Sequence, residues 1–136
     1  MKIWRSVSVV LFLCLASEQV SATSNYKYRR GEYVTVIGGR SPDGRYSIAT
    51  HGGGELGYDN WHVYLMNAKS GKKIGPLEEI QDPLDTAAEG YVAKWSSDSR
   101  QVSITYRAER HVSVTVVYRI GNRRAYLVSG PQLPVE

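Results

Sequence analysis

The sequence predicts an all-β fold of eight antiparallel strands, arranged as two four-stranded meander repeats. Short runs of alternating apolar and polar residues recur along the chain, and no segment has a convincing helical period. The string SPDGRYSIAT at residues 41–50 also returns, in altered form, as SSDSRQVSIT at residues 96–105. Alternation is typical of half-buried strands, and self-similarity at a fixed spacing indicates a structural repeat. A chain of 136 residues is long enough for one domain with one modest core.

The first 22 residues are predicted to be a signal peptide. Lys2 and Arg5 form a positive start, residues 7–16 are uncharged and mostly apolar, and residues 20–22 offer small side chains for cleavage. The apolar run is shorter than the roughly 20 residues that a membrane-spanning helix needs. An uncleaved anchor is the alternative interpretation.

Cleavage at this position leaves residues 23–136 as a single β domain, which we expect in the periplasm or outside the cell. The only cysteine, Cys14, leaves with the signal peptide, so we expect no disulfide and no cysteine-bound metal. The signal peptide also removes two of 17 basic and one of 13 acidic residues, which leaves a formal charge of +3. That mild excess does not indicate a nucleic-acid partner. No transmembrane span is expected after cleavage.

A polar arm at residues 23–30, expected to be frayed, precedes eight strand-like runs. In the clearest run, HVSVTVVYRI, apolar residues alternate with serine, threonine and arginine. Short turns rich in glycine, serine, asparagine and aspartate separate the runs. The predicted strands are residues 33–38, 45–50, 61–68, 73–77, 91–95, 100–107, 111–120 and 123–129.

These runs group in fours, so residues 33–80 and 91–130 form two repeats offset by about 58 residues. Each repeat contains strand, serine-aspartate turn, strand, connection, strand, tight turn and strand. The acidic segment at residues 78–90 is expected to be a solvated connection between the repeats.

The first serine-aspartate turn, Ser41-Pro42-Asp43-Gly44, has the residue preferences of a type I β-turn. The Asp43 side chain is expected to accept hydrogen bonds from backbone amides of the turn, and Asp98 is expected to do the same in the second copy. The apolar ladder that follows the turn begins one residue later in the second copy. A shift of one residue exchanges the two faces of a strand.

SPDGRYSIA and the later VYLMNAKSGKKI resemble the blade repeat of TolB-like β-propellers, and AKWSSDSRQVSITY with VSVTVVYRI is a weaker second copy. The resemblance implies one four-stranded sheet per repeat and brings no catalytic residues. Propellers have about 4–8 blades, whereas this chain has two, so it cannot close a ring alone. We expect the two sheets to pack face to face as a sandwich-like pair. Assembly of several chains into an oligomeric propeller is the alternative.

The glycine-rich loop between the second and third strands holds the candidates for chemistry. His51, Glu55, Asp59 and His62 have metal-ligating side chains, but their spacing matches no zinc or EF-hand pattern. HGGG at residues 51–54 imitates an oxyanion-hole loop, although no G-x-S-x-G nucleophile elbow is present. A flexible solvated loop is the favoured interpretation, and a metal site or hydrolase site is the alternative.

The order of the turns predicts a sorting of charge, because successive connections of a meander alternate between the two ends of the sheet. The turns at residues 40–44, 68–72, 96–99 and 121–122 should share one end, called the turn end below. Most basic residues lie at or beside these turns, and most acidic residues lie in the connections at the opposite end. The predicted binding residues are Lys69, Lys72, Lys73, Arg123 and Arg124.

The sequence therefore predicts an exported binding or interaction module without a cofactor, rather than an enzyme. The expected partner is an unknown protein or an anionic polymer of the cell envelope, which the basic end would contact. A metal-binding protein or hydrolase using the loop from His51 to His62, and a structural subunit of an oligomeric propeller, are the alternatives.

Overall fold

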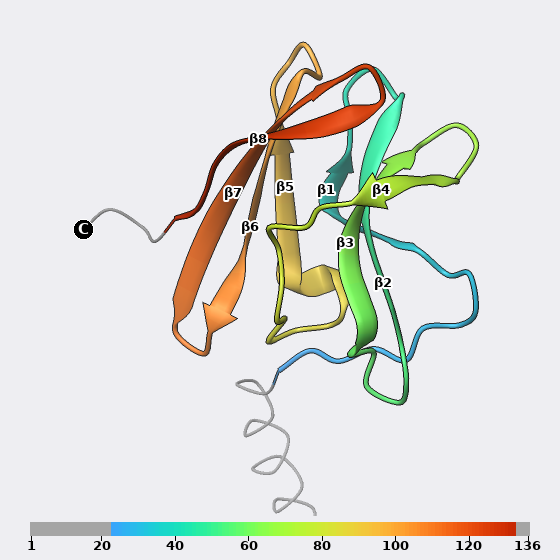
Figure 1. Ribbon diagram of the computed structural model, residues 1–136, viewed down its shortest axis with the longest axis vertical. Helices are drawn as coiled ribbons and strands as arrows, with labels where there is room; N and C mark the ends of the chain where they lie inside the picture. Colours follow the sequence, from blue (N-terminus) through green and yellow to red (C-terminus); the bar gives the residue numbers. More distant parts are fainter. Residues whose placement is uncertain (1–22, 133–136) are drawn as a thin grey trace, which may run out of the picture.

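A computed structural model describes residues 23–132 and contains one β-sheet of eight strands (Figure 1). The predicted signal peptide, with Cys14, and residues 133–136 lie outside the described residues. The strands are β1 (Val34–Arg40), β2 (Tyr46–Gly53), β3 (Asp59–Asn67), β4 (Lys73–Pro76), β5 (Tyr91–Trp95), β6 (Gln101–Glu109), β7 (Val112–Gly121) and β8 (Arg124–Gln132). One short 3-10 turn, η3 (Ala88–Gly90), precedes β5. The predicted all-β fold is confirmed, and within residues 23–132 no helix is long and apolar enough to cross a membrane.

The strand order in the sheet is β4-β3-β2-β1-β5-β6-β7-β8. Each half is an antiparallel meander in which strands adjacent in sequence are paired. The halves meet at β1 and β5, which run parallel and are paired at Ile37 and Val92. The sequence did not reveal this parallel pair, because parallel neighbours are joined by a long connection that carries no hairpin signal.

The sheet bends about β1 and β5, so that one face of each half lines a common core (Figure 1). Both halves contribute side chains with 0 % exposure, such as Ile48 and Val63 from the first half and Ile104 and Val116 from the second. The sheet is nearly closed: its two edge strands, β4 and β8, come close enough that β4 and the start of β8 line one small hollow. The expected face-to-face pair is thus one continuous sheet with a single core.

The one-residue slip between the repeats follows from the parallel pairing of β1 and β5. In β2 the ladder of Tyr46 and Ile48 points into the core, and in β6 the ladder of Val102 and Ile104 does so. β1 and β5 run in the same direction, but the two meanders extend from them toward opposite edges of the sheet, so the second half is turned over relative to the first. The surfaces that face one another are then opposite faces of the repeat, and a one-residue shift supplies apolar side chains on the opposite face.

The connection at residues 78–90 is packed against the core, so its prediction as a solvated segment is wrong. Leu77 and Ile80 are buried, and Asp85 and Thr86 are only 2 % and 0 % exposed. The connection crosses the open end of the core, and it has to bury side chains there to exclude water.

The N-terminal arm is also ordered, and the expectation that it is frayed is wrong. The backbone N–H of Ser24 donates to Asp85 Oδ1 at 2.7 Å, and the carbonyl of Ser24 accepts from the N–H groups of Thr86 and Ala87. Tyr28 is 8 % exposed, and its hydroxyl bonds to Thr50 Oγ1 and to the carbonyl of Thr86. Buried polar groups of the connection need partners, and the arm supplies them.

Candidate functional site

The two histidines of the glycine-rich loop region lie opposite one another on β2 and β3, where His51 pairs with His62. His51 Nδ1 bonds to the carbonyl of Glu32, and its ring stacks on Tyr33 with centroids 4.5 Å apart. His62 lies edge-on to Tyr64 at 5.8 Å. Both imidazoles therefore belong to an aromatic cluster on the outer face of the first half.

The two acids of this set do not join the histidines. Glu55 forms an exposed ion pair with Lys27 at 3.2 Å, and Asp59 lies beside Gly53 and Gly54. Among residues 23–132 there is no group of three or more potential ligands placed to hold a metal ion. A structural zinc site has four ligands and a catalytic site three, so two imidazoles alone do not make either. No geometry in this region favours the metal or hydrolase alternative.

Close packing explains the glycines of this loop better than chemistry does. A Cβ atom on Gly52 would lie 2.1 Å from the carbonyl oxygen of Gly57. A Cβ atom on Gly57 would lie 2.4 Å from the carbonyl oxygen of Tyr26, and Gly57 has a φ of +81°. The hydroxyl of Thr86 donates to the carbonyl of Leu56 and holds the loop against the connection. Only glycine permits this backbone approach.

The two serine-aspartate turns form the same hydrogen bonds. In the first turn, Ser41 Oγ donates to Asp43 Oδ1 at 2.7 Å, and the N–H of Arg45 donates to the same oxygen at 3.0 Å. In the second turn, Ser96 Oγ donates to Asp98 Oδ1 at 2.6 Å, and the N–H of Arg100 donates to it at 3.0 Å.

Each turn is also closed by its backbone and by the serine hydroxyl. The N–H of Gly44 donates to the carbonyl of Ser41, and the N–H of Ser99 donates to the carbonyl of Ser96, both at 2.9 Å. Each serine Oγ accepts the N–H of the residue five positions later at 3.0 Å. The predicted role of Asp43 and Asp98 as acceptors for turn amides is confirmed.

The two turns touch one another at the turn end. The N–H of Asp43 donates to Ser99 Oγ at 3.0 Å, and Ser99 is only 5 % exposed. The turn between β7 and β8 lies beside them. Together they enclose an open concave surface of about 740 Å³, called the basic hollow below. Its lining residues are Asp43, Arg45, Tyr46, Asp98, Ser99, Arg100, Ile120, Gly121, Asn122 and Arg123.

The carboxylates in the basic hollow are held by the turns. Hydrogen bonds from Ser41 and from the N–H of Arg45 lower the pKa of Asp43 below its ordinary value. Ser96 and the N–H of Arg100 do the same for Asp98. One oxygen of each carboxylate is thus already occupied by two donors. Neither acid forms an ion pair with an arginine, since the ion pairs among residues 23–132 are Lys27–Glu55 and Arg107–Asp85.

The five predicted binding residues have different surroundings, although Arg123 and Arg124 line a small hollow together with β4. The Lys73 ammonium lies over the ring of Tyr64 at 5.5 Å, on the outer face of the first half. The Arg124 guanidinium lies over the ring of Tyr126 at 5.3 Å, a contact on the β7–β8 side of the molecule. Lys69 and Lys72 are exposed in the turn between β3 and β4. Of the five, only Arg123 lines the basic hollow.

Arg45 and Arg100 lie beside the predicted turns at residues 40–44 and 96–99, but they are not among the five predicted binding residues. The signal was present, because each arginine follows the aspartate of its turn by two positions. Duplicated turns that pack together necessarily bring equivalent residues together. That contact between turns depends on how the halves fold onto one another, which no local pattern reports.

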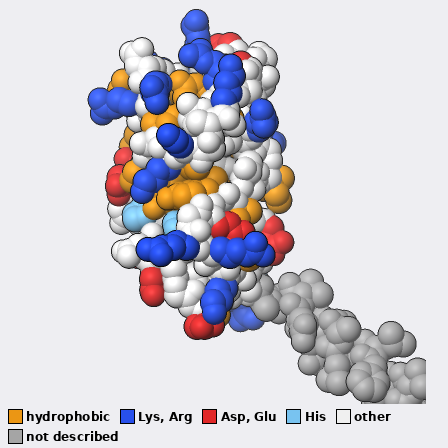
Figure 2. All heavy atoms as spheres, turned by 90° about the vertical axis from the view of Figure 1, so that its right-hand side faces the viewer, with side chains coloured by type: hydrophobic (Ala, Val, Ile, Leu, Met, Phe, Trp, Pro, Cys, Tyr) orange, Lys and Arg blue, Asp and Glu red, His pale blue; other side chains and the backbone are white. Residues whose placement is uncertain are grey.

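At the opposite end, the glycine-rich loop lies against the acidic connection at residues 78–90. The Tyr58 hydroxyl donates to the carbonyl of Leu84, which joins the glycine-rich loop to the connection. Arg107 of β6 forms a bidentate pair with Asp85, with Nη2–Oδ1 at 2.8 Å and Nε–Oδ2 at 3.2 Å. Figure 2 shows lysine and arginine over the upper part of one face, whereas aspartate and glutamate lie mainly in its lower half among further basic residues.

Comparisons of the chain with protein-family models, with curated proteins and with solved structures give no match. The functional inference therefore depends on the geometry of the described residues.

Proposed function

We propose that this chain is an exported binding module that docks on an anionic polymer of the cell envelope through its turn end. The observation that carries the proposal is the gathering of Arg45, Arg100 and Arg123 around the basic hollow. Export follows from the predicted signal peptide. The TolB-like resemblance stays a prediction about the origin of the two repeats.

The arginines of the basic hollow are suited to carboxylates, phosphates and sulfates. A guanidinium is always charged and presents a planar set of donors that matches these groups. All three arginines are exposed and make none of the ion pairs among the described residues. They are therefore available to an outside anion.

An extended polymer fits this surface better than a single small anion. The hollow is wide and open, so it cannot exclude water from one bound ion. Exposed ionic contacts are individually weak and are screened within about 8 Å at physiological salt. A repeating anion engages several arginines at once, and the summed contacts then give useful affinity.

The oligomeric-propeller alternative is less well supported. A further blade would have to cover the outer face of the second half, which is mainly polar. Lys94 and Thr105 are exposed there, and the hydroxyls of Thr105 and Thr115 bond to each other at 2.9 Å. Polar faces of this kind are solvated rather than buried between sheets.

The proposal is tested by salt elution from an immobilised polyuronate, with polygalacturonate as the probe. The wild-type mature chain should be retained at low salt and released as the salt concentration rises. The triple variant Arg45→Glu, Arg100→Glu and Arg123→Glu should pass through the column unretained.

A matched variant shows whether retention depends on the position of the arginines or only on the net charge of the protein. Arg29→Glu, Arg30→Glu and Arg110→Glu change the net charge by the same amount on exposed residues that lie outside the basic hollow. This variant should remain bound at low salt. Equal loss of retention in both triple variants, or retention that does not respond to salt, would contradict docking through the turn end.

A further inference from the structure

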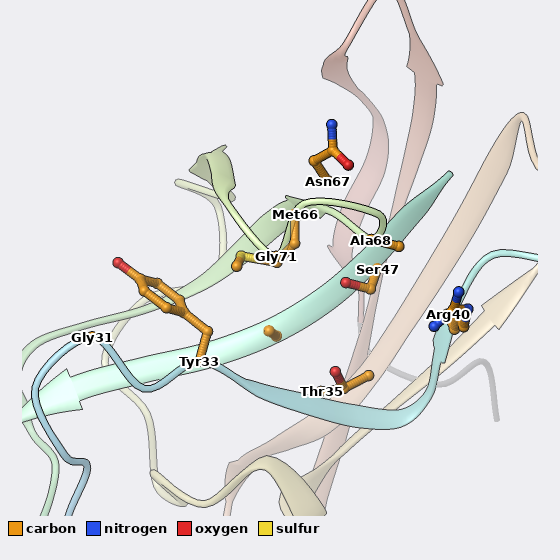
Figure 3. Close-up of a pocket in the computed structure, with 10 residues that line it drawn as sticks. Gly31, Tyr33, Thr35, Arg40, Ser47, Met66, Asn67, Ala68 and Gly71 are labelled. Atoms are coloured by element: carbon orange, nitrogen blue, oxygen red, sulfur yellow. The ribbon is translucent and has the colours of Figure 1, made fainter. Parts of the chain in front are cut away.

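We infer that a groove on the outer face of the first half binds one uronate residue of an acidic polysaccharide. This inference rests on the proposed function and extends it, because it names the class of polymer and a site that binds one of its sugar residues. The groove has a volume of about 400 Å³ and runs along β1 and β2 under the β3–β4 turn (Figure 3). That volume lies in the range of about 300–1,000 Å³ that is usual for small-molecule sites.

The groove has different chemistry at its two ends. Figure 3 shows Tyr33 at one end and Arg40 at the other, with Thr35 and Ser47 between them. Met66 and the turn from Asn67 to Gly71 form the opposite wall (Figure 3). One end thus offers an aromatic ring, the middle offers hydroxyl groups, and the far end offers a permanent positive charge.

The aromatic end is rigid before any ligand arrives. The Tyr33 ring stacks on His51 and meets Tyr64 edge-on with centroids 5.2 Å apart. Ala49, Tyr64 and Met66 are each less than 8 % exposed and form a small apolar cluster beneath Tyr33. Figure 2 shows an apolar area in the middle of this face, next to histidine side chains. A fixed ring loses little side-chain entropy when the apolar face of a sugar packs on it.

The polar groups of the groove are not used within the described part of the chain. Among residues 23–132, the hydroxyls of Thr35 and Ser47 have no side-chain hydrogen bond, and Arg40 is in neither of the two ion pairs. A purely apolar ligand would desolvate these groups without pairing them, at a cost in free energy. A pyranose supplies hydroxyls for the middle of the groove, and a carboxylate on the same sugar pairs with Arg40.

The position of Arg40 connects the groove to the basic hollow. Arg40 ends β1 and is followed directly by the turn that contains Asp43, and Arg45 after that turn lines the hollow. A polyuronate seated at Tyr33 with one carboxylate on Arg40 therefore continues toward the arginines of the turn end.

The test measures binding of trigalacturonate to the mature chain by titration calorimetry, with the neutral trisaccharide galactotriose and inorganic tripolyphosphate as comparison probes. Trigalacturonate should bind, and galactotriose should bind more weakly by about tenfold or more. Tripolyphosphate should bind more weakly by the same factor when Arg45, Arg100 and Arg123 are changed to glutamate, which removes the phosphate-binding charges of the basic hollow. Arg40→Gln and Tyr33→Ala should each weaken trigalacturonate binding by about tenfold or more. Equal binding of the neutral sugar, absence of trigalacturonate binding, or equal binding of tripolyphosphate by the triple variant at Arg45, Arg100 and Arg123 would overturn the inference.

Matched variants keep this result interpretable. Tyr126→Ala removes an aromatic ring from the second half, and Arg110→Gln removes a charge far from the groove; both should bind trigalacturonate within about twofold of wild type. Tyr33→Phe keeps the ring and should also bind within about twofold, which separates loss of the ring from loss of folding. Weakening in either distant variant as large as in Arg40→Gln would overturn the inference.

The two proposals fail in different ways. The triple variant at Arg45, Arg100 and Arg123 should keep its affinity for the short trigalacturonate while losing retention on the polymer. If Arg40→Gln leaves trigalacturonate binding unchanged but polymer retention persists, the groove inference is wrong and docking through the turn end survives.

Discussion

The two halves of the sheet share their turn chemistry but differ in the face that they bury. The hydrogen bonds around Asp43 and Asp98 are the same to within 0.1 Å in the serine-to-aspartate and backbone-to-aspartate contacts. Yet the residue five positions after the first serine of the turn differs in its surroundings. Tyr46 in the first half packs in the core, whereas its equivalent in the second half, Gln101, is exposed. Local hydrogen bonds follow from local sequence, whereas the buried face follows from the place of each half in the sheet.

The outer faces differ as well, and this difference separates a candidate binding face from a solvated one. The first half carries the aromatic cluster of Tyr33, His51 and Tyr64 on its outer face. The second half carries polar residues such as Thr105 and Thr115. Two repeats with one turn motif have therefore acquired different surfaces.

The largest expected effect comes from exchanging equivalent positions of the two halves. Val102 and Ser47 each occupy the sixth position after the first serine of their turn, but Val102 is 0 % exposed and Ser47 is half-buried on the outer face. Val102→Ser should lower the free energy of unfolding by about 3–5 kcal/mol, because it removes apolar burial and buries a hydroxyl. Ser47→Val should change it by less than about 0.5 kcal/mol. Urea unfolding measures both, and similar losses would contradict opposite burial of the two faces.

The second effect concerns the ion pair that ties β6 of the second half to the connection. Asp85 is 2 % exposed and accepts from Arg107 and from the N–H of Ser24. Asp85→Ala should cost about 3 kcal/mol, at the lower end for a buried pair because the Arg107 side chain is 31 % exposed.

The matched control is the other ion pair, Lys27–Glu55, whose side chains are 66 % and 84 % exposed. Glu55→Ala should leave the thermal midpoint unchanged within error, since exposed pairs contribute little. A midpoint for Asp85→Ala as high as for Glu55→Ala would show that the connection is not held by this contact.

The third effect compares Ser99 with its counterpart Gly44, both of which have positive φ (62° and 72°). Ser99→Ala keeps a side chain at positive φ and removes the acceptor of the Asp43 N–H, so it should cost about 1–2 kcal/mol. Ser99→Gly loses the same bond but relieves the backbone, so it should be more stable than Ser99→Ala by about 1 kcal/mol. Equal denaturant midpoints for the two variants would show that the positive φ at this position does not destabilise the protein.

The smallest expected effect is a dependence on pH that the two turns share. Hydrogen bonds from Ser41 and Ser96 lower the pKa values of Asp43 and Asp98 in the folded state. Their contribution to stability is present above the unfolded pKa of about 4 and is lost as the pH falls through the lower folded values. The double variant Asp43→Asn and Asp98→Asn should therefore lose less stability than wild type between about pH 5 and 2. Urea titrations at several pH values measure this loss. If the free energy of unfolding falls equally with pH in wild type and in the double variant, the two aspartates do not cause the dependence on pH.

The acidic connection and the N-terminal arm show why part of the structure was not predictable from sequence. Their apolar residues have no clear period, so the sequence predicts that both segments are solvated. In the structure Ile80 and Tyr28 are buried, and Asp85 and Thr86 bind the arm. These segments are ordered because the end of the core between the two halves has to be covered, and only the assembled sheet creates that requirement.

Local sequence is sufficient to predict the eight strands, the two meanders and the hydrogen bonds of the two turns. Each of these depends on residues close together in the chain, through alternation, turn preference and short side-chain contacts. Tertiary structure alone decided the parallel pairing of β1 with β5, the contact of Asp43 with Ser99, and the grouping of Arg45, Arg100 and Arg123. Those features depend on how one half is placed against the other, and the shared core that fixes this placement forms between residues far apart in sequence.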